Sequence, residues 1–321
     1  MANASDAVPS MRFDSSVPSP ARVYDYFLGG KDNFAADREA AERSIRVVPE
    51  TPWFARENRK FLGRAVRFCA AAGITQFLDI GSGLPTMDNV HQVAERVTSA
   101  PRVMYVDNDP VVVSHAQALM SGPHAAAARG DLTRPDEILA SAPVRDMIDF
   151  SQPVAILLVA VLHFIPDDAD PAGCVAELMD AAAPGSYLII SHTEISQAHA
   201  VGTDYQSEAA GELRDIWKKM PQVPARGRSE IEGFFRGLTL MEPGLVDIWA
   251  WRPDSVAAVP ATDVMRVLGG VARKGEPGHR LSPRAAAPDA RCRAAGYCGS
   301  SRRRGRCGRA AMRRGSRRGR R

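Results

Sequence analysis

Short apolar segments with the character of β-strands alternate with helix-like segments between residues 74 and 194. The strand-like segments read ITQFLDI, RVMYVDN, an alanine-rich stretch ending at GDL, PVAILLVAVLHF and GSYLIISH, and the helix-like segments include DNVHQVAERV, PVVVSHAQALM and PAGCVAELMDAAA. Alternation at this pitch predicts a mostly parallel sheet with helices on both faces. The segment PVAILLVAVLHF is apolar almost throughout, which is typical of a central strand buried on both faces. The sequence therefore predicts an α/β fold.

The segments on either side of this alternation suggest the domain organisation. Residues 1–19 are polar and rich in proline and serine, which indicates a flexible N-terminus. Residues 20–73 contain three helical patterns, which we expect to form a cap or lid beside a domain at 74–274. Residues 197–228 of that domain form a polar insertion of helical character. Residues 275–321 have no periodic apolar face, which predicts a disordered tail.

Charge divides the chain into an acidic body and a basic tail, although its formal net charge is only +4. From Glu276 to Arg321 there are fifteen arginines and two acids, or +13, so the remaining 275 residues carry −9. The acidic body argues against a nucleic-acid substrate. The tail contains a single aromatic residue, Tyr297, and so lacks the aromatic side chains on which bases stack. The tail can be interpreted as a nonspecific polycation or as the product of a shifted reading frame. We expect no specific nucleic-acid partner.

No segment of the sequence has the character of a membrane span. The longest apolar run, Val154 to Ile165, has twelve residues and includes His163, which is too short to cross a bilayer. The first sixteen residues show no basic start followed by an apolar stretch, so no secretory signal is expected. We expect a cytoplasmic protein that does not enter a membrane.

The segment FLDIGSGLPTM at residues 77–87 resembles a nucleotide-binding loop that lacks one glycine. Gly81 and Gly83 follow the first predicted strand, and Thr86 stands where a dinucleotide-binding loop has its third glycine. Glycines let the backbone approach a ligand closely, and a dinucleotide also needs helix amides presented to its pyrophosphate. S-adenosylmethionine has no phosphate. The pattern therefore favours S-adenosylmethionine over a nicotinamide cofactor.

Acidic residues stand at the ends of three consecutive predicted strands, where ligands of open α/β sheets bind. Asp79 can orient the glycine loop or meet the methionine part of the cofactor through water. Asp107, followed by Asn108, is placed to accept hydrogen bonds from both ribose hydroxyls. Asp131, followed by Leu132, would lie near the adenine amine. Each acid alone is more often a helix cap or turn residue, but the three together predict a cofactor site.

The segment YDYFLGGKDNF at residues 24–34 is unusual for a junction between helices. In one interpretation it is a lid over the cofactor, with a glycine hinge and candidate cofactor-binding residues Tyr26, Gly30, Lys31 and Asn33. In the other interpretation its aromatic side chains only anchor the first helix on the sheet. Arg22 is equally compatible with a partner for the methionine carboxylate and with a solvated surface charge.

Several of these motifs resemble the actinobacterial S-adenosyl methyltransferase family that was long catalogued only as a domain of unknown function. The similarity spans roughly residues 18–274. It is carried by SPARVYDYFLGGKDNFAADREAA, FLDIGSGLPTMDNVHQVA, YVDNDPVVVSHAQALM, VAVLHFIPD and GSYLIISH. The resemblance implies a Rossmann-like, seven-stranded sheet with a reversed last strand, S-adenosylmethionine as cofactor, and methyl transfer. It names no substrate, and the basic tail departs from the family pattern.

Two histidines at predicted strand ends are the candidates for chemistry on the acceptor side. His163 ends the central strand and His192 ends the next one. Either could act as a base or orient the acceptor, or could be a histidine satisfied by neighbouring backbone groups. No residues have the spacing of metal ligands, so no metal is expected.

Three functions are compatible with these patterns. The favoured one is an S-adenosylmethionine-dependent methyltransferase acting on a small molecule, which the predicted cap and insertion would enclose. The alternatives are an NAD(P)-dependent oxidoreductase and a non-catalytic sensor of the cofactor. The acceptor atom and the oligomeric state are left open by the sequence.

Overall fold

The computed structural model describes residues 14–86, 88–119, 122–194, 226–255, 259 and 266–276. By its internal contacts the chain divides into two units, Met1–His279 and Arg280–Arg321, and all the elements below belong to the first. The expectations of a flexible N-terminus, of the insertion at 197–228 and of a disordered tail concern residues that lie largely outside the described part of the chain.

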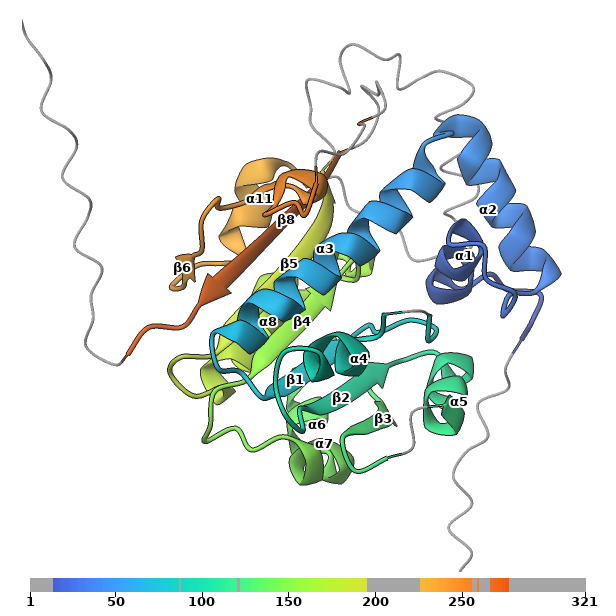
Figure 1. Ribbon diagram of the computed structural model, residues 1–321. Helices are drawn as coiled ribbons and strands as arrows, with labels where there is room; N and C mark the ends of the chain where they lie inside the picture. The colour runs from blue at the N-terminus through green and yellow to red at the C-terminus, as the bar shows by residue number, and fades with distance from the viewer. Residues whose placement is uncertain are drawn as a thin grey trace, which may run out of the picture. The chain divides into compact units, whose positions relative to one another are not determined.

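A sheet of eight strands runs through the first unit (Figure 1). Its strands are β1 (Gln76–Ile80), β2 (Arg102–Asp107), β3 (Ala125–Arg129), β4 (Ala155–Val159), β5 (Tyr187–Glu194), β6 (Thr239–Leu240), β7 (Val246–Asp247) and β8 (Arg266–Arg273). The order is β3-β2-β1-β4-β5-β8-β6, with β7 also paired to β8. The first five strands are parallel and β8 is antiparallel to β5, which confirms the mostly parallel sheet and its reversed last strand. The eighth strand arises because the segment 238–251 forms two short strands around a turn at Glu242–Gly244 instead of one.

Helices cover both faces of this sheet. They are α1 (Pro20–Phe27), α2 (Ala35–Val47), α3 (Thr51–Ala71), α4 (Val90–Glu95), α5 (Pro110–Leu119), α6 (Pro135–Ala140), α7 (Ala142–Met147), α8 (Pro171–Ala181) and α11 (Arg228–Gly233), with short 3₁₀ turns η1 (Leu162–Phe164), η2 (Asp167–Ala169) and η3 (Ile248–Ala250). Side chains of α3, α4 and α5 share one buried cluster with Phe77 and Leu157. Side chains of α6, α7, α8 and α11 share the other with Leu78 and Leu158. Burial on both faces explains why β1 and β4 are buried throughout.

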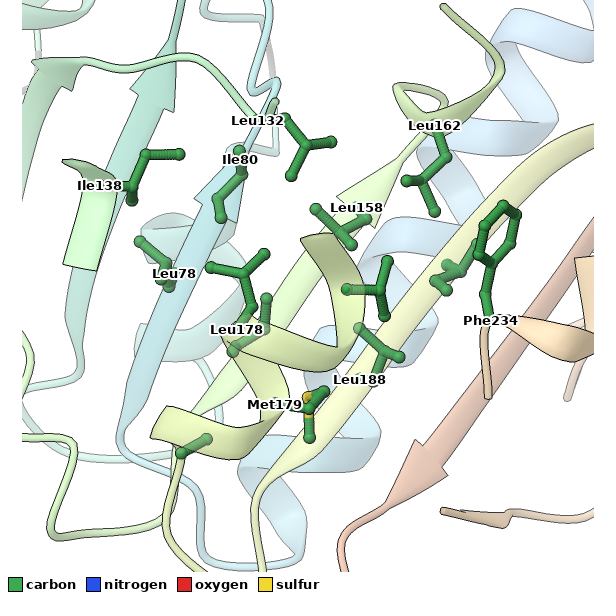
Figure 2. Close-up of a cluster of buried hydrophobic side chains, with 14 of the residues drawn as sticks. Leu78, Ile80, Leu132, Ile138, Leu158, Leu162, Leu178, Met179, Leu188 and Phe234 are labelled. Carbon is green, nitrogen blue, oxygen red and sulfur yellow. The ribbon is translucent and has the colours of Figure 1, made fainter. Parts of the chain in front are cut away.

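The second of these cores shows how the sequence fixes a helix against the sheet. Asp170 precedes α8, and its side chain accepts a hydrogen bond from the backbone of Gly173, which caps the helix beside Pro171. Leu178 and Met179 of α8 then pack onto side chains of β1, β4 and β5 (Figure 2). Removing this apolar surface from water stabilises the domain by roughly 25 cal/mol per Å² buried.

The first two helices form a small apolar cluster of their own. Val23 and Phe27 of α1 pack on Ala40 and Ala41 of α2, together with Ala55 of α3. The rest of α3 belongs to the core of the sheet. Thus, within residues 20–73, α1 and α2 form the part that stands apart from the sheet, and α3 joins the two.

The direction in which the strands are added changes at β1. From β1 the chain adds β2 and β3 on one side, and then β4 and β5 on the other. In open α/β sheets the loops beyond such a point leave a crevice in which ligands bind. The loops after β1, β2 and β4 are therefore where a site is expected. No helix in the described part of the chain is both long and apolar enough to span a bilayer.

Candidate functional site

The loop after β1 uses its glycines for conformation and for close approach. Gly81 and Gly83 both have positive φ, 73° and 66°, which favours glycine at both positions. A Cβ at Gly81 would lie 2.4 Å from a methyl group of Val161, which follows β4. The backbone N–H of Gly81 donates to the carbonyl of Val106 at 2.8 Å. The loop is thereby held against the ends of both neighbouring strands.

Asp107 at the end of β2 is bound directly to this loop. One carboxylate oxygen, Oδ2, accepts a hydrogen bond from the N–H of Gly83 at 2.9 Å, and Oδ1 accepts one from the N–H of Asp109 at 2.9 Å. Burial raises the pKa of Asp107 to about 6, although these backbone hydrogen bonds act in the opposite direction. The predicted proximity of the glycine loop and Asp107 is therefore present in the structure.

Asp79 lies buried at the end of β1, close enough to Asp107 for their charges to interact. Burial is the main reason that the pKa of Asp79 is raised to about 7; the charge of Arg59 acts in the opposite direction, and the charge of Asp107 acts in the same direction. Two buried carboxylates with raised pKa values favour ligand groups that donate hydrogen bonds or carry positive charge. Ribose hydroxyls and a sulfonium compound with an ammonium group have these properties.

The carboxylate of the third predicted acid, Asp131, forms hydrogen bonds within its own turn. Its Oδ1 accepts hydrogen bonds from the N–H of Thr133 at 2.9 Å and from its hydroxyl at 2.8 Å. Leu132 is buried in the core beside Ile138 (Figure 2), and the side chain of Asn108 is exposed. The N–H of Gly130 donates to the carbonyl of Asp107, so the ends of β2 and β3 do adjoin.

The predicted lid contacts the glycine loop through α1, and a pocket lies between them. It is lined by Ala21, Tyr24, Asp25 and Leu28 of α1 and its end, by Arg59 of α3, and by Ser82, Gly83, Leu84 and Thr86 of the loop. Two of the predicted lid residues lie against this lining: Gly30 packs on Asp25, and Asn33 Nδ2 donates to Asp25 Oδ2 at 2.8 Å. The other two are not part of the lining, since the hydroxyl of Tyr26 donates to Glu42 and Lys31 is exposed.

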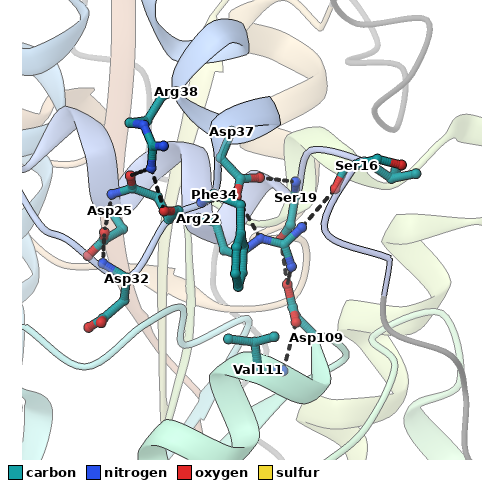
Figure 3. A network of polar contacts seen from close by, with 12 residues as sticks. Ser16, Ser19, Arg22, Asp25, Asp32, Phe34, Asp37, Arg38, Asp109 and Val111 are labelled. Atoms are coloured by element: carbon teal, nitrogen blue, oxygen red, sulfur yellow. Dashed lines mark hydrogen bonds and ion pairs between the residues drawn. The ribbon is translucent and has the colours of Figure 1, made fainter.

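An ion network fastens α1 to the loop after β2 (Figure 3). Arg22 is 3% exposed and pairs with Asp37 at 2.9 Å and with Asp109 at 3.1 Å. The hydroxyl of Ser19 also donates to Asp109, at 2.6 Å. Arg22 is therefore not a solvated surface charge, and the sequence alternative that treats it as one is wrong. Asp109, which the sequence patterns did not single out, links the cap to Asp107, because its own N–H donates to Asp107 Oδ1.

A second polar chain runs from the cap to the ends of β4 and β5. Asn58 of α3 donates to the hydroxyl of Tyr24 at 3.0 Å and accepts from the hydroxyl of Ser191 at 2.6 Å. Ser191 in turn accepts a hydrogen bond from the N–H of Ala160, whose φ is 57°. The anchoring role of Tyr24 is real, since its hydroxyl also donates to the carbonyl of Ala55. Cap, β4 and β5 are thus connected through buried hydrogen bonds.

The two candidate histidines lie together, His163 in η1 after β4 and His192 within β5, with ring centroids 5.5 Å apart. His192 is fully buried: its Nδ1 lies 2.7 Å from the carbonyl of Thr193 and its Nε2 lies 3.3 Å from Arg226. A guanidinium only donates, so Nε2 of His192 accepts and Nδ1 carries the proton. Arg226 also pairs with Asp167 at 2.7 Å. Both ring nitrogens of His192 are therefore used within the protein.

His163 differs from His192 in having an unused nitrogen. It is 8% exposed, and its Nδ1 is buried without a hydrogen-bond partner among the residues that the structure describes. Burial, together with the electrostatic influence of His192 and the positive charge of Arg226, holds the pKa of His163 well below its usual value. The ring is neutral at physiological pH and can accept a proton. The described residues include no group of three metal-binding side chains near it or elsewhere.

The sequence of the chain matches the family described as S-adenosyl methyltransferase over residues 6–275. The chain belongs to the S-adenosyl methyltransferase family. Its cofactor is S-adenosylmethionine, and the match ends where the basic tail begins. The glycine loop and the buried carboxylates of Asp79 and Asp107 fit such a cofactor.

Solved structures agree with this assignment. A candidate methyltransferase from Thermobifida fusca is 41% identical, with a TM-score of 0.73, and the alignment covers 84% of this chain and all of that one. A DUF574 family protein from Streptomyces avermitilis is 38% identical, with a TM-score of 0.74, over 82% of this chain and all of that one. No curated protein matches the sequence.

Asp79→Asn should make the stability of this methyltransferase less dependent on pH. The carboxyl has a pKa of about 7 in the fold against 3.8 when unperturbed, so between these values the native chain binds a proton that the unfolded chain does not. The contribution of this carboxyl to wild-type stability should therefore fall as pH rises from 5 to 8, and the asparagine variant should lack that loss, which is on the order of 1–3 kcal/mol. Urea unfolding at several pH values measures this. Asp146→Asn, on an exposed part of α7, is the control, and equal slopes for wild type and Asp79→Asn would contradict the prediction.

Proposed function

We propose that this methyltransferase methylates a small-molecule acceptor and that His163 takes the proton that the acceptor loses. The observation that carries the second part is the buried Nδ1 of His163, which has no partner among the described residues and lies just beyond β4. A buried ring nitrogen left without a hydrogen bond costs stability, which a bound hydroxyl or protonated amine would offset.

The residues of the site have different proposed roles, which follow from their positions. S-adenosylmethionine supplies an activated methyl group together with its leaving group. Asp107 offers carboxylate oxygens to ribose hydroxyls, and the glycine loop provides the close backbone approach. His163, neutral because of burial, would accept the proton that the acceptor loses when the methyl group passes to it from the sulfonium, which leaves as a thioether. Alignment of acceptor and methyl group accounts for most of the remaining acceleration.

Two observations support a small acceptor over a macromolecular one. The body of the chain carries −9, which disfavours nucleic acid. The cap is fastened beside the end of β2 by Arg22 and Ser19, both of which bind Asp109, and so restricts the approach to this edge of the sheet. Both described cysteines, Cys69 and Cys174, are free and buried, and we place the reaction in the reducing cytoplasm.

Methyl-labelled cofactor and an extract divided by ultrafiltration test this function. We expect label to move into the low-mass fraction when the wild-type protein is present, and not when it is heat-inactivated. Label that appears in protein or nucleic acid would contradict the small-molecule proposal. Cofactor binding by calorimetry without transfer to any fraction would favour the sensor function instead.

A further inference from the structure

Asp25 and Arg59 are the two charged residues in the lining of the pocket between α1 and the glycine loop. We propose that these two side chains bind the amino-acid end of the cofactor, Asp25 its α-ammonium and Arg59 its α-carboxylate. The proposal rests on S-adenosylmethionine as the cofactor, and it adds two residues that no sequence pattern indicated.

Asp25 is a buried carboxylate without a cation. It is 4% exposed, and its Oδ2 accepts hydrogen bonds from the N–H of Asp32 at 3.0 Å and from Asn33 at 2.8 Å. Two other buried acids near the cap, Asp37 and Asp109, both pair with Arg22. Across the described ranges no ion pair reaches Asp25, and burial raises its pKa. A ligand ammonium would supply the missing charge.

Gly30 keeps the carboxylate of Asp25 in this position. A Cβ at Gly30 would lie 1.9 Å from Asp25 Oδ1, so any larger residue would displace the side chain. The N–H of Gly30 also donates to the carbonyl of Asp25 at 2.9 Å. The glycine pair of the cap thus closes the chain around Asp25, which is a physical reason for the GG motif besides a hinge.

The size of the pocket suits one small polar group. Its volume is about 20 Å³, enough for a single ammonium group but not also for a carboxylate, so we place the α-carboxylate outside it, at the half-exposed side chain of Arg59. The bulk of the cofactor must therefore lie outside the pocket, along the glycine loop. This arrangement places only the end of the ligand between α1 and the loop.

Arg59 completes the pair from the side of α3. Its Nη2 donates to the carbonyl of Asp88 at 3.1 Å, which fixes the half-exposed side chain beside the loop. Its charge lowers the pKa of Asp79, so it also lies near the end of β1. A planar guanidinium held at one nitrogen retains donors for a carboxylate.

The ribose-binding position lies next to this pocket. Gly83 lines the pocket, and its N–H donates to Asp107 Oδ2. Gly83 therefore lies between Asp107, which would bind the ribose, and the pocket, where the amino-acid end would bind. A ligand in which one sulfur joins ribose to an amino acid fits these two neighbouring positions.

Calorimetry with three probes tests the inference. S-adenosylhomocysteine carries the whole amino-acid end, its decarboxylated analogue retains only the ammonium, and 5′-methylthioadenosine has neither group. Asp25→Asn should weaken the first two by at least about tenfold, and Arg59→Met should weaken only the first by a similar factor. Neither variant should change methylthioadenosine binding more than about twofold, the size expected for a contact outside the altered site.

Glu39→Gln on α2 and Lys60→Met on α3 are matched controls, because they change exposed side chains and should leave all three affinities unchanged. Equal weakening of all three probes would mean that Asp25 and Arg59 only support the fold, and unchanged affinity for S-adenosylhomocysteine would exclude them from its site. Either result overturns the inference and leaves the cofactor assignment intact. A wild-type protein that binds none of the probes overturns both. If Asp25→Asn does not fold, the affinities of wild type and Arg59→Met for the three probes still test whether Arg59 binds the α-carboxylate.

Discussion

Replacing His163 with glutamine should lower the rate of methyl transfer by at least about 100-fold, the usual effect of removing a positioned base. The affinity for S-adenosylhomocysteine should stay within about twofold, because His163 lies beyond β4 and outside the loop that contacts Asp107. Single-turnover transfer from labelled cofactor and calorimetry with S-adenosylhomocysteine measure the two effects separately.

The pH profile gives this prediction a second readout. Since burial and neighbouring positive charge hold the pKa of His163 well below its usual value, the wild-type rate should not fall as pH is lowered to about 6.5, where an ordinary histidine titrates. His124→Gln, at a half-exposed position before β3, is the control and should keep full activity. A parallel loss of transfer and cofactor affinity in His163→Gln would show that the ring serves the fold and not the reaction.

Replacing Asp107 with alanine should weaken S-adenosylhomocysteine binding by at least about 100-fold. The variant would lose the acceptor that we propose for two ribose hydroxyls, and hydrogen bonds to a charged group contribute about 1.5–3 kcal/mol each. It also releases the N–H of Gly83, which the carboxylate holds at 2.9 Å. Calorimetry measures the affinity, and thermal unfolding shows whether the variant is folded.

Asp107→Asn separates the two roles of this residue. The amide oxygen can still accept from the N–H of Gly83, while the charge and one acceptor are lost, so we expect an intermediate loss of roughly tenfold. Asp136→Ala, an exposed acid of α6, should have no effect. Binding by Asp107→Ala as tight as that of the wild type would remove the ribose role and with it the basis of the cofactor site.

Several parts of this architecture follow from local sequence. The alternating segments gave strands and helices in the expected order, because burial on one or two faces leaves a periodic pattern in the chain. Gly81 and Gly83 were recognisable because a sharp turn after a buried strand favours their conformations. Asp107 was recognisable because it ends a strand, and parallel strands end at one edge of the sheet.

Other parts depend on residues that meet only in the folded chain. Asp109 and Arg22 are 87 positions apart, and no periodicity links them. Sequence treated His163 and His192 alike, but only their surroundings show that Arg226 and Thr193 use both nitrogens of one and leave Nδ1 of the other unpaired. The sequence predicted similar roles for Asp131 and Asp107, but the carboxylate of Asp131 accepts a hydrogen bond from the N–H of Thr133 in its own turn.

The sequence by itself determined the sheet, the glycine loop and the acid that faces it, since these follow from the hydrophobic periodicity and backbone preferences of neighbouring residues. Only the tertiary structure decided which charges are paired and which are left for a ligand. Pairing depends on distances between segments far apart in the chain and on burial from water, and neither is written in local sequence. Asp25 illustrates this, because an acid on a short helix becomes a candidate for binding an ammonium group only once its burial and its lack of a described cation partner are known.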